Sequence, residues 1–137
     1  MRLLVCSSII LLLFSTTPAL TQETIFGKNK VQYTEFEWYY IQSDHFDIYF
    51  NIGGEYIANF TADVAESSYT QISKSFRYQI TNRIPIIVYN SHNEFQQTNV
   101  VNSYLEEGIG GVTELFKNRV VLPFEGDYKK FRHVIHH

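Results

Sequence analysis

The feature that most constrains the fold is an amphipathic segment from Glu55 to Phe76, which lies between β-rich runs. A helix of this length measures roughly 33 Å at the helical rise per residue, which is long enough to cover one face of a sheet. Its apolar residues recur at helical spacing: Ile57, Phe60, Val64, Ala65, Tyr69, Ile72 and Phe76. The segment therefore predicts a long helix that packs on a sheet.

Short runs with strand character flank this helix. Glu35–Gln42 and Phe46–Phe50 are separated by the turn-forming residues Ser43-Asp44-His45 and predict a β-hairpin. Ile84–Tyr89 is a dense β-branched run, which predicts a strand buried on both faces. Pro85 lies near the start of that strand, where a missing N–H is tolerated.

Two further elements are predicted toward the C-terminus. Ser91 and Glu94 have the spacing of a capping box, so a short helix is expected after Ser91. Val112–Phe116 and Arg119–Pro123 are joined by a two-residue polar turn and predict a second hairpin after the glycine-rich residues 108–111. The predicted fold class is α+β, a twisted mixed sheet with a long covering helix.

A last helix is expected to begin at Tyr128, with Asp127 as its N-cap and an apolar stripe at Phe131, Val134 and Ile135. The chain reaches its last residue inside this apolar-periodic pattern. We therefore expect the domain to be incomplete at its C-terminus.

Three of the five histidines lie at the end of this helix, at positions 133, 136 and 137. His133 and His137 are four residues apart, so they share a helical face and could bind one metal ion through neutral ring nitrogens. Alternatively, His137 is the first residue of an H-E-x-x-H motif that continues beyond it. The third interpretation is a histidine cluster that binds nothing, and the residues alone leave all three open.

The N-terminal segment differs from the rest. A basic start, an apolar run from Leu3 to Phe14 and small residues after it predict a secretory signal peptide over residues 1–21. The apolar run is shorter than the roughly 20 residues that span a bilayer, which argues against the alternative of an uncleaved anchor. We expect an exported protein, periplasmic or secreted, with a polar lead-in at residues 22–35.

Composition limits the chemistry. The only cysteine, Cys6, lies in the predicted signal peptide, so a metal in the mature chain would need His, Asp, Glu or water ligands. Without the signal peptide the chain carries 10 basic and 14 acidic side chains, a net charge of −4 with histidine neutral. No basic patch is present, so nucleic-acid partners are disfavoured.

Three other groups of residues have simpler explanations. Asp44, His45 and Asp47 could form a metal site, but a hairpin turn explains them better. The pair Glu106-Glu107 fits a solvated turn before the glycines. The run Trp38-Tyr39-Tyr40 could stack on a sugar, but core packing is the preferred interpretation.

The order of these motifs resembles the gluzincin zinc metallopeptidases, in particular the peptidase MA-like domains of exported bacterial proteins. The resemblance covers the chain from about Trp38 onward. It is carried by Ile84–Phe95, Gly110–Glu114, Arg119–Pro123 and Phe131–His137. In that family, a run similar to the last of these continues as Glu-x-x-His.

The resemblance implies a role for each matching position. His137 would be the first zinc ligand, whereas the general-base glutamate and the other ligands would lie beyond it. Val112, Thr113, Glu114 and Leu115 would form the edge strand that binds a peptide or protein substrate. The glycines at 108, 110 and 111 would let the backbone pass close to the cleft. Zn²⁺ is expected in the complete domain only.

Residues 36–137 would then be the N-terminal part of a peptidase MA-like domain, and this part alone would lack the residues for catalysis. The alternative is a non-catalytic, peptidase-like binding or assembly module of the bacterial cell envelope. In the family, a TolB-like β-propeller often follows, and it could contact envelope proteins. A small secreted α+β domain complete at 137 residues is the third option.

Overall fold

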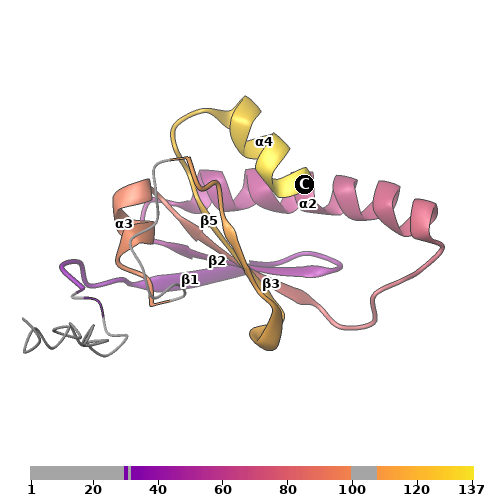
Figure 1. The fold of residues 1–137 in the computed structure, drawn as a ribbon, viewed down its shortest axis with the longest axis horizontal. Coiled ribbons are helices and arrows are strands. Elements are labelled where there is room, and N and C mark those ends of the chain that lie inside the picture. Colours follow the sequence, from indigo (N-terminus) through magenta and orange to yellow (C-terminus); the bar gives the residue numbers. More distant parts are fainter. Residues whose placement is uncertain (1–29, 31, 100–107) are drawn as a thin grey trace, which may run out of the picture.

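The computed structural model describes residue 30, residues 32–99 and residues 108–137. The elements in chain order are β1 (Trp38–Gln42), β2 (Phe46–Asn51), α2 (Glu55–Phe76), β3 (Ile84–Tyr89), α3 (His92–Gln96), β4 (Val112–Glu114), the 3₁₀ turn η1 (Leu115–Lys117), β5 (Arg119–Pro123) and α4 (Tyr128–His136). Figure 1 shows their arrangement. The predicted signal peptide, most of the lead-in, and the pair at 106–107 lie outside the described residues.

The described strands form one mixed sheet in the order β1-β2-β3-β5-β4. The outer pairs, β1 with β2 and β4 with β5, are antiparallel. The inner pairs, β2 with β3 and β3 with β5, are parallel. A mixed sheet with helices confirms the predicted α+β class.

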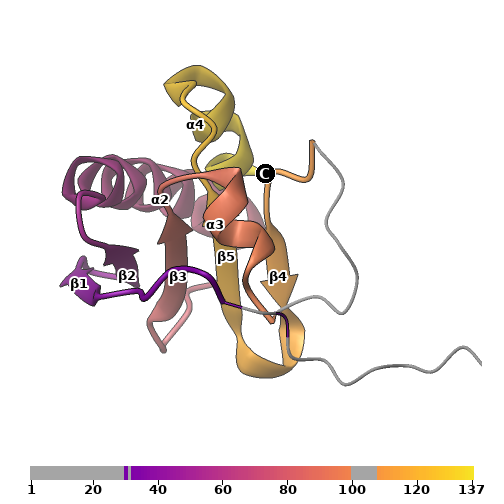
Figure 2. The same cartoon turned by 90° about the vertical axis from the view of Figure 1, so that its left-hand side faces the viewer.

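Helices α2 and α4 cover one face of this sheet, as Figures 1 and 2 show from two directions. The face beneath them carries Ile48 and Val88, each with no exposed surface. Ala58 of α2 is also fully buried against this cluster. Burying one large aliphatic side chain is worth about 1.5–3 kcal/mol, so this layer supplies the main core.

Helix α2 has the predicted bounds. It begins after Gly54, whose carbonyl accepts a 2.9 Å hydrogen bond from Ala58 N–H. It ends at Arg77, which adopts the left-handed conformation with φ 51° and donates its N–H to the Ser73 carbonyl. This cap ends the helix without a glycine.

The opposite face is covered in part by α3 and by Phe36, which lies just before β1. Phe95 of α3 is fully buried beside Tyr89 and Val121. Ser91 accepts a hydrogen bond from Glu94 N–H at 3.2 Å, which is half of the predicted capping box. The Glu94 carboxylate accepts a 3.0 Å hydrogen bond from the N–H of Asn90, the residue before the N-cap Ser91.

One predicted strand is shorter than expected. The expected strand Val112–Phe116 ends at Glu114, and Leu115 lies in η1. In this turn Leu115 is 78% exposed and Phe116 is fully exposed. Asn118 closes the turn in the left-handed conformation, with φ 49°. Including Leu115 in the edge strand was therefore wrong.

Candidate functional site

A cleft of about 860 Å³ opens where the end of α4 meets the second half of α2 and the sheet. Its wall includes β4 and the glycines before it. The lining residues are Phe46, Ala65, Ser68, Tyr69, Ile72, Ser73, Phe76, Tyr78, Ile80, Ile84, Ile86, Gly110, Gly111, Val112, Thr113, Val120, Leu122, His133, Val134, Ile135, His136 and His137. None of these described residues is Asp, Glu, Lys or Arg, so the described part of the lining is largely apolar apart from its three histidines.

Helix α4 is held at its start and packed along its length. Asp127 accepts hydrogen bonds from the N–H groups of Lys129 and Lys130 at 2.8 and 3.2 Å. These bonds, then the nearby lysine charges, lower the pKa of Asp127. Phe131 is buried, with its ring 5.3 Å from that of Phe124. The packed first turns fix the direction in which the histidines emerge.

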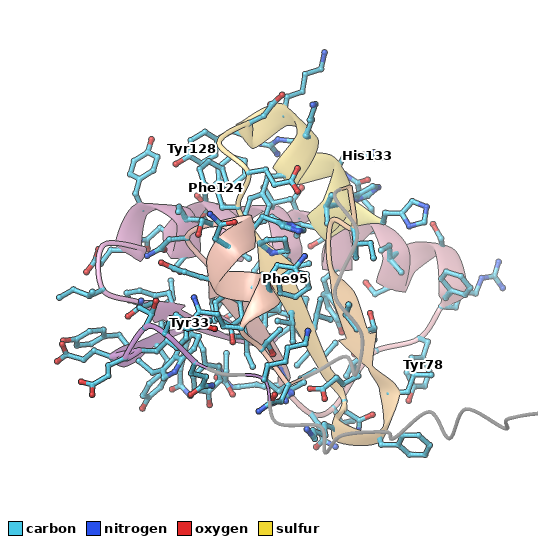
Figure 3. All side chains as sticks on the ribbon, turned by 60° about the vertical axis from the view of Figure 1, so that its left-hand side comes forward. Tyr33, Tyr78, Phe95, Phe124, Tyr128 and His133 are labelled. Carbon is cyan, nitrogen blue, oxygen red and sulfur yellow. The ribbon has the colours of Figure 1, made fainter. Side chains whose placement is uncertain are left out.

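The three histidines divide into a pair and a single residue. The rings of His133 and His137 lie 5.9 Å apart between centroids, tilted by 62°, and both residues are exposed. Figure 3 labels His133 on the last turns of α4. The shared helical face predicted for this pair is therefore present.

His136 is held differently. Its Nδ1 lies 2.8 Å from the Ser68 hydroxyl, which itself donates to the Val64 carbonyl at 2.8 Å. A hydroxyl has one hydrogen, so when Ser68 donates to Val64 it can only accept from a His136 that carries a proton on Nδ1. His136 therefore ties α4 to the middle of α2.

The described residues do not complete a zinc site. In the part of the chain that the structure describes, no three His, Cys, Asp or Glu side chains gather as a metal site would require. His133 and His137 supply two imidazole nitrogens, whereas catalytic zinc uses three protein ligands. Any zinc site here would need ligands beyond these two.

Strand β4 lies at the edge of the sheet and pairs only with β5 among the described strands. Val112 and Thr113 line the cleft, so two of the four predicted edge-strand residues reach it. Glu114 instead pairs with Arg119 and, at 3.0 Å, with Lys117. Burial would raise the pKa of Glu114, but the hydrogen bonds and charges of these partners outweigh it and lower the pKa.

Two of the three glycines before β4 line the cleft and pack closely on β5 and α4. A Cβ on Gly111 would lie 2.5 Å from Leu122 Cδ2 and 3.0 Å from the Val121 carbonyl oxygen. A Cβ on Gly110 would lie 2.8 Å from Val134 Cγ2. Gly108 has open space but a φ of +102°, so its role is the turn.

A second polar cluster, which the sequence did not reveal, joins the first hairpin turn to α2. The Glu66 carboxylate accepts from the Ser43 hydroxyl at 2.6 Å and the His45 N–H at 2.8 Å, and its other oxygen lies 2.7 Å from His45 Nδ1. Burial would raise the pKa of Glu66, but these hydrogen bonds lower it below its ordinary value. The cluster joins Ser43 and His45 of the hairpin turn to α2.

Comparisons of the chain with protein-family models, with curated proteins and with solved structures find no match. Among the helices of the described residues, none has both the length and the apolar character to cross a membrane.

Proposed function

We propose that this chain forms the N-terminal part of a zinc-dependent, peptidase-like domain of an exported protein. His137 would be a metal ligand in it, and β4 would bind a peptide substrate. The observation that carries the proposal is the meeting of β4 and the histidine-bearing end of α4 in one cleft. The resemblance in motif order to peptidase MA-like domains supports it as well.

The cleft suits an extended peptide for a physical reason. An edge strand has backbone N–H and C=O groups on its outer side that can pair with a peptide, as in β-augmentation. Thr113 is exposed at this edge, and Gly110 and Gly111 bring the backbone close to α4 and β5. A peptide paired with β4 would therefore run beside the last turn of α4.

In this proposal the remaining zinc ligands would come from residues after His137, as the family resemblance implies. The proposal requires a glutamate directly after His137 and a histidine four positions after it. Zinc held in such a site would lower the pKa of its bound water to about 7 and would polarise a carbonyl. Within this chain, the packing of Phe131 and the Asp127 cap would orient His137 toward the cleft.

The coding sequence beyond His137 gives the first test. A residue other than Glu at the next position, or one other than His at the fourth, contradicts the peptidase proposal. Zinc ligands without the glutamate would favour the non-catalytic envelope module instead.

Metal binding by the full-length protein gives the second test. We expect one zinc per chain by elemental analysis, lost in His137→Ala and retained in His133→Ala. Loss in both variants would favour the His133–His137 pair, and retention in both would exclude His137 as a ligand. Peptidase activity on a fluorogenic protein substrate should follow the zinc content.

Export is proposed on the N-terminal pattern alone. Expression with the natural N-terminus in a bacterial host should place the protein outside the cytoplasm, shortened at Ala19 or Thr21. Intact mass measurement distinguishes these two cleavage positions. A membrane-bound product that keeps residues 1–21 would favour the uncleaved anchor.

A further inference from the structure

A second hollow lies on the face of the sheet opposite α2, and it shares no lining residue with the cleft at α4. Its volume is about 460 Å³. The residues that line it are Trp38, Tyr49, Pro85, Ile87, Tyr89, Thr98, Arg119 and Val121. This size lies within the range of small-molecule pockets, so the hollow can hold a ligand of its own.

Aromatic rings on neighbouring strands shape the hollow. Trp38 is 40% exposed, and its ring meets Tyr89 edge-on, with centroids 5.4 Å apart at 84°. Phe36 packs on Trp38 from a tilted position, 5.6 Å between centroids. These contacts hold the indole in place while leaving part of it at the surface.

The second aromatic wall comes from β2. Tyr49 lies directly across from Tyr40 of β1, and the two rings are 5.7 Å apart at 30°. Tyr49 is also the register partner of Ile87 on β3, which lines the hollow. Because β1, β2 and β3 are hydrogen-bonded to one another, the rings are positioned before any ligand arrives.

The polar groups that line the hollow are hydroxyls and one guanidinium group, which has an acidic partner. Arg119 is the only charged residue among the described lining residues, and Glu114 forms an ion pair with it. Tyr89 and Thr98 share a hydrogen bond, and burial, the largest effect, raises the pKa of Tyr89. Its hydroxyl therefore stays protonated at neutral pH. The site offers hydroxyl groups without an unmatched charge.

We propose that this hollow binds a neutral sugar ring of a glycan. The C–H face of a pyranose is apolar and stacks on an aromatic ring, while its hydroxyls hydrogen-bond around the edge. Trp38 and Tyr49 supply rings, and Tyr49 and Arg119 supply polar atoms beside them, while the buried Thr98 hydroxyl bonds Tyr89. A charged ligand is less favoured because Glu114 already neutralises Arg119. This inference does not depend on the peptidase proposal.

Trp38 makes the site directly observable, since it is the only tryptophan in the chain. The test is a titration of the full chain with cellohexaose, chitohexaose and, as the rival ligand, a decaproline peptide, followed by tryptophan fluorescence. Aromatic grooves also bind proline-rich peptides, which is why the peptide is included. We expect a saturable change with at least one oligosaccharide and none with decaproline.

Matched variants assign the signal to the hollow. Tyr49→Ala should weaken sugar binding about tenfold, the scale of one lost aromatic contact. Tyr49→Phe keeps the ring and should lose less. Tyr56→Ala, which changes a tyrosine that is 74% exposed on α2 across the sheet, should leave binding unchanged. Circular dichroism and thermal melts check that each variant is folded.

The outcomes that overturn the proposal are definite. They are the absence of a saturable change with both oligosaccharides, binding of decaproline in their place, or equal affinity in Tyr49→Ala and the unmodified chain. If Tyr49→Ala fails to fold, the affinity of Trp38→Phe for the oligosaccharide is measured by calorimetry instead. It should be lower than that of the unmodified chain, and equal affinity would overturn the proposal.

Discussion

The two halves of α2 have the same apolar periodicity but different surroundings. From Ile57 to Ser68 the stripe is buried beneath α4 and against the sheet. Beyond Ser68 the stripe continues, yet Ile72 is 42% exposed and Phe76 is 79% exposed. The difference shows that periodicity defines the face of a helix, whereas burial also needs a partner on that face.

Helix α4 marks the boundary between these halves. Its first residue, Tyr128, packs on Phe60 with ring centroids 4.8 Å apart. Its last, His136, bonds Ser68. Thus α4 runs alongside the first half of α2 in the same direction and stops where the cleft begins. The uncovered half of α2 is one wall of that cleft.

The largest expected effect tests the covered half. Phe131→Ala removes a side chain that is 4% exposed between α4 and α2. Truncating a buried phenylalanine costs about 3–5 kcal/mol of unfolding free energy. Urea unfolding followed by circular dichroism measures this cost. A loss below about 1 kcal/mol would mean that α4 does not pack on α2 in solution.

The next effect concerns the wall that β4 adds to the cleft. Gly111→Ala places a methyl group against Leu122 and the Val121 carbonyl, at 2.5 and 3.0 Å. Such overpacking costs about 1–3 kcal/mol. Gly110→Ala meets only the half-buried Val134 side chain, which can shift, so its cost should be smaller. Thermal melts of the two variants should show this order, and the reverse order would contradict the close approach to β5.

A smaller effect is expected at Glu66, in the middle of α2. Because its pKa is lowered in the folded state, its stabilisation is present above the unfolded pKa of about 4.3 and is lost as pH falls through the folded pKa. Glu66→Gln should cost roughly 1 kcal/mol at neutral pH and flatten this acid dependence. Unfolding curves at neutral and acidic pH measure both.

Ser43→Ala serves as the companion variant, because it removes one hydrogen-bond donor to the Glu66 carboxylate and leaves the contacts from His45. Its pH dependence should fall between those of Glu66→Gln and the unmodified chain. An unchanged profile in Glu66→Gln would show that the carboxylate does not anchor the hairpin turn.

The smallest effect is expected in the uncovered half. Phe76→Ala removes a side chain that is 79% exposed, so the unfolding free energy should change by no more than about 0.5 kcal/mol. The same urea assay applies. A loss comparable to that of Phe131→Ala would mean that the second half of α2 is covered in solution, and sedimentation would then show whether a second copy covers it.

Local patterns in the sequence predicted the elements well. The periodicity of residues 55–76 defined α2, and the β-branched run at 84–89 defined β3. Asp127 caps α4 as expected, because a cap depends only on residues two or three positions away. The β-propensity of the sequence extends to Leu115 and Phe116, but β4 ends at Glu114 and both side chains are exposed in η1.

Contacts between distant residues were not predictable in the same way. The bonds from Glu66 to Ser43 and His45, and from Ser68 to His136, join residues 21 to 68 positions apart. No local pattern encodes them, because they arise from strand order and helix placement. The edge position of β4 came from the family resemblance. The sequence offered sugar stacking for Trp38-Tyr39-Tyr40 but favoured core packing, whereas these residues are 40%, 42% and 59% exposed. The other residues of the hollow come together only in the assembled sheet.

Strand β1 has a consequence for handling the protein. Among the described strands it forms the other edge of the sheet, and its residues Trp38–Gln42 contain no charge and no proline. An exposed edge strand without a charge or a proline can pair through its free N–H and C=O groups with a strand of another molecule. Concentrated solutions should therefore self-associate through β1, and Tyr40→Lys, at a position 59% exposed, should keep the chain monomeric at higher concentration.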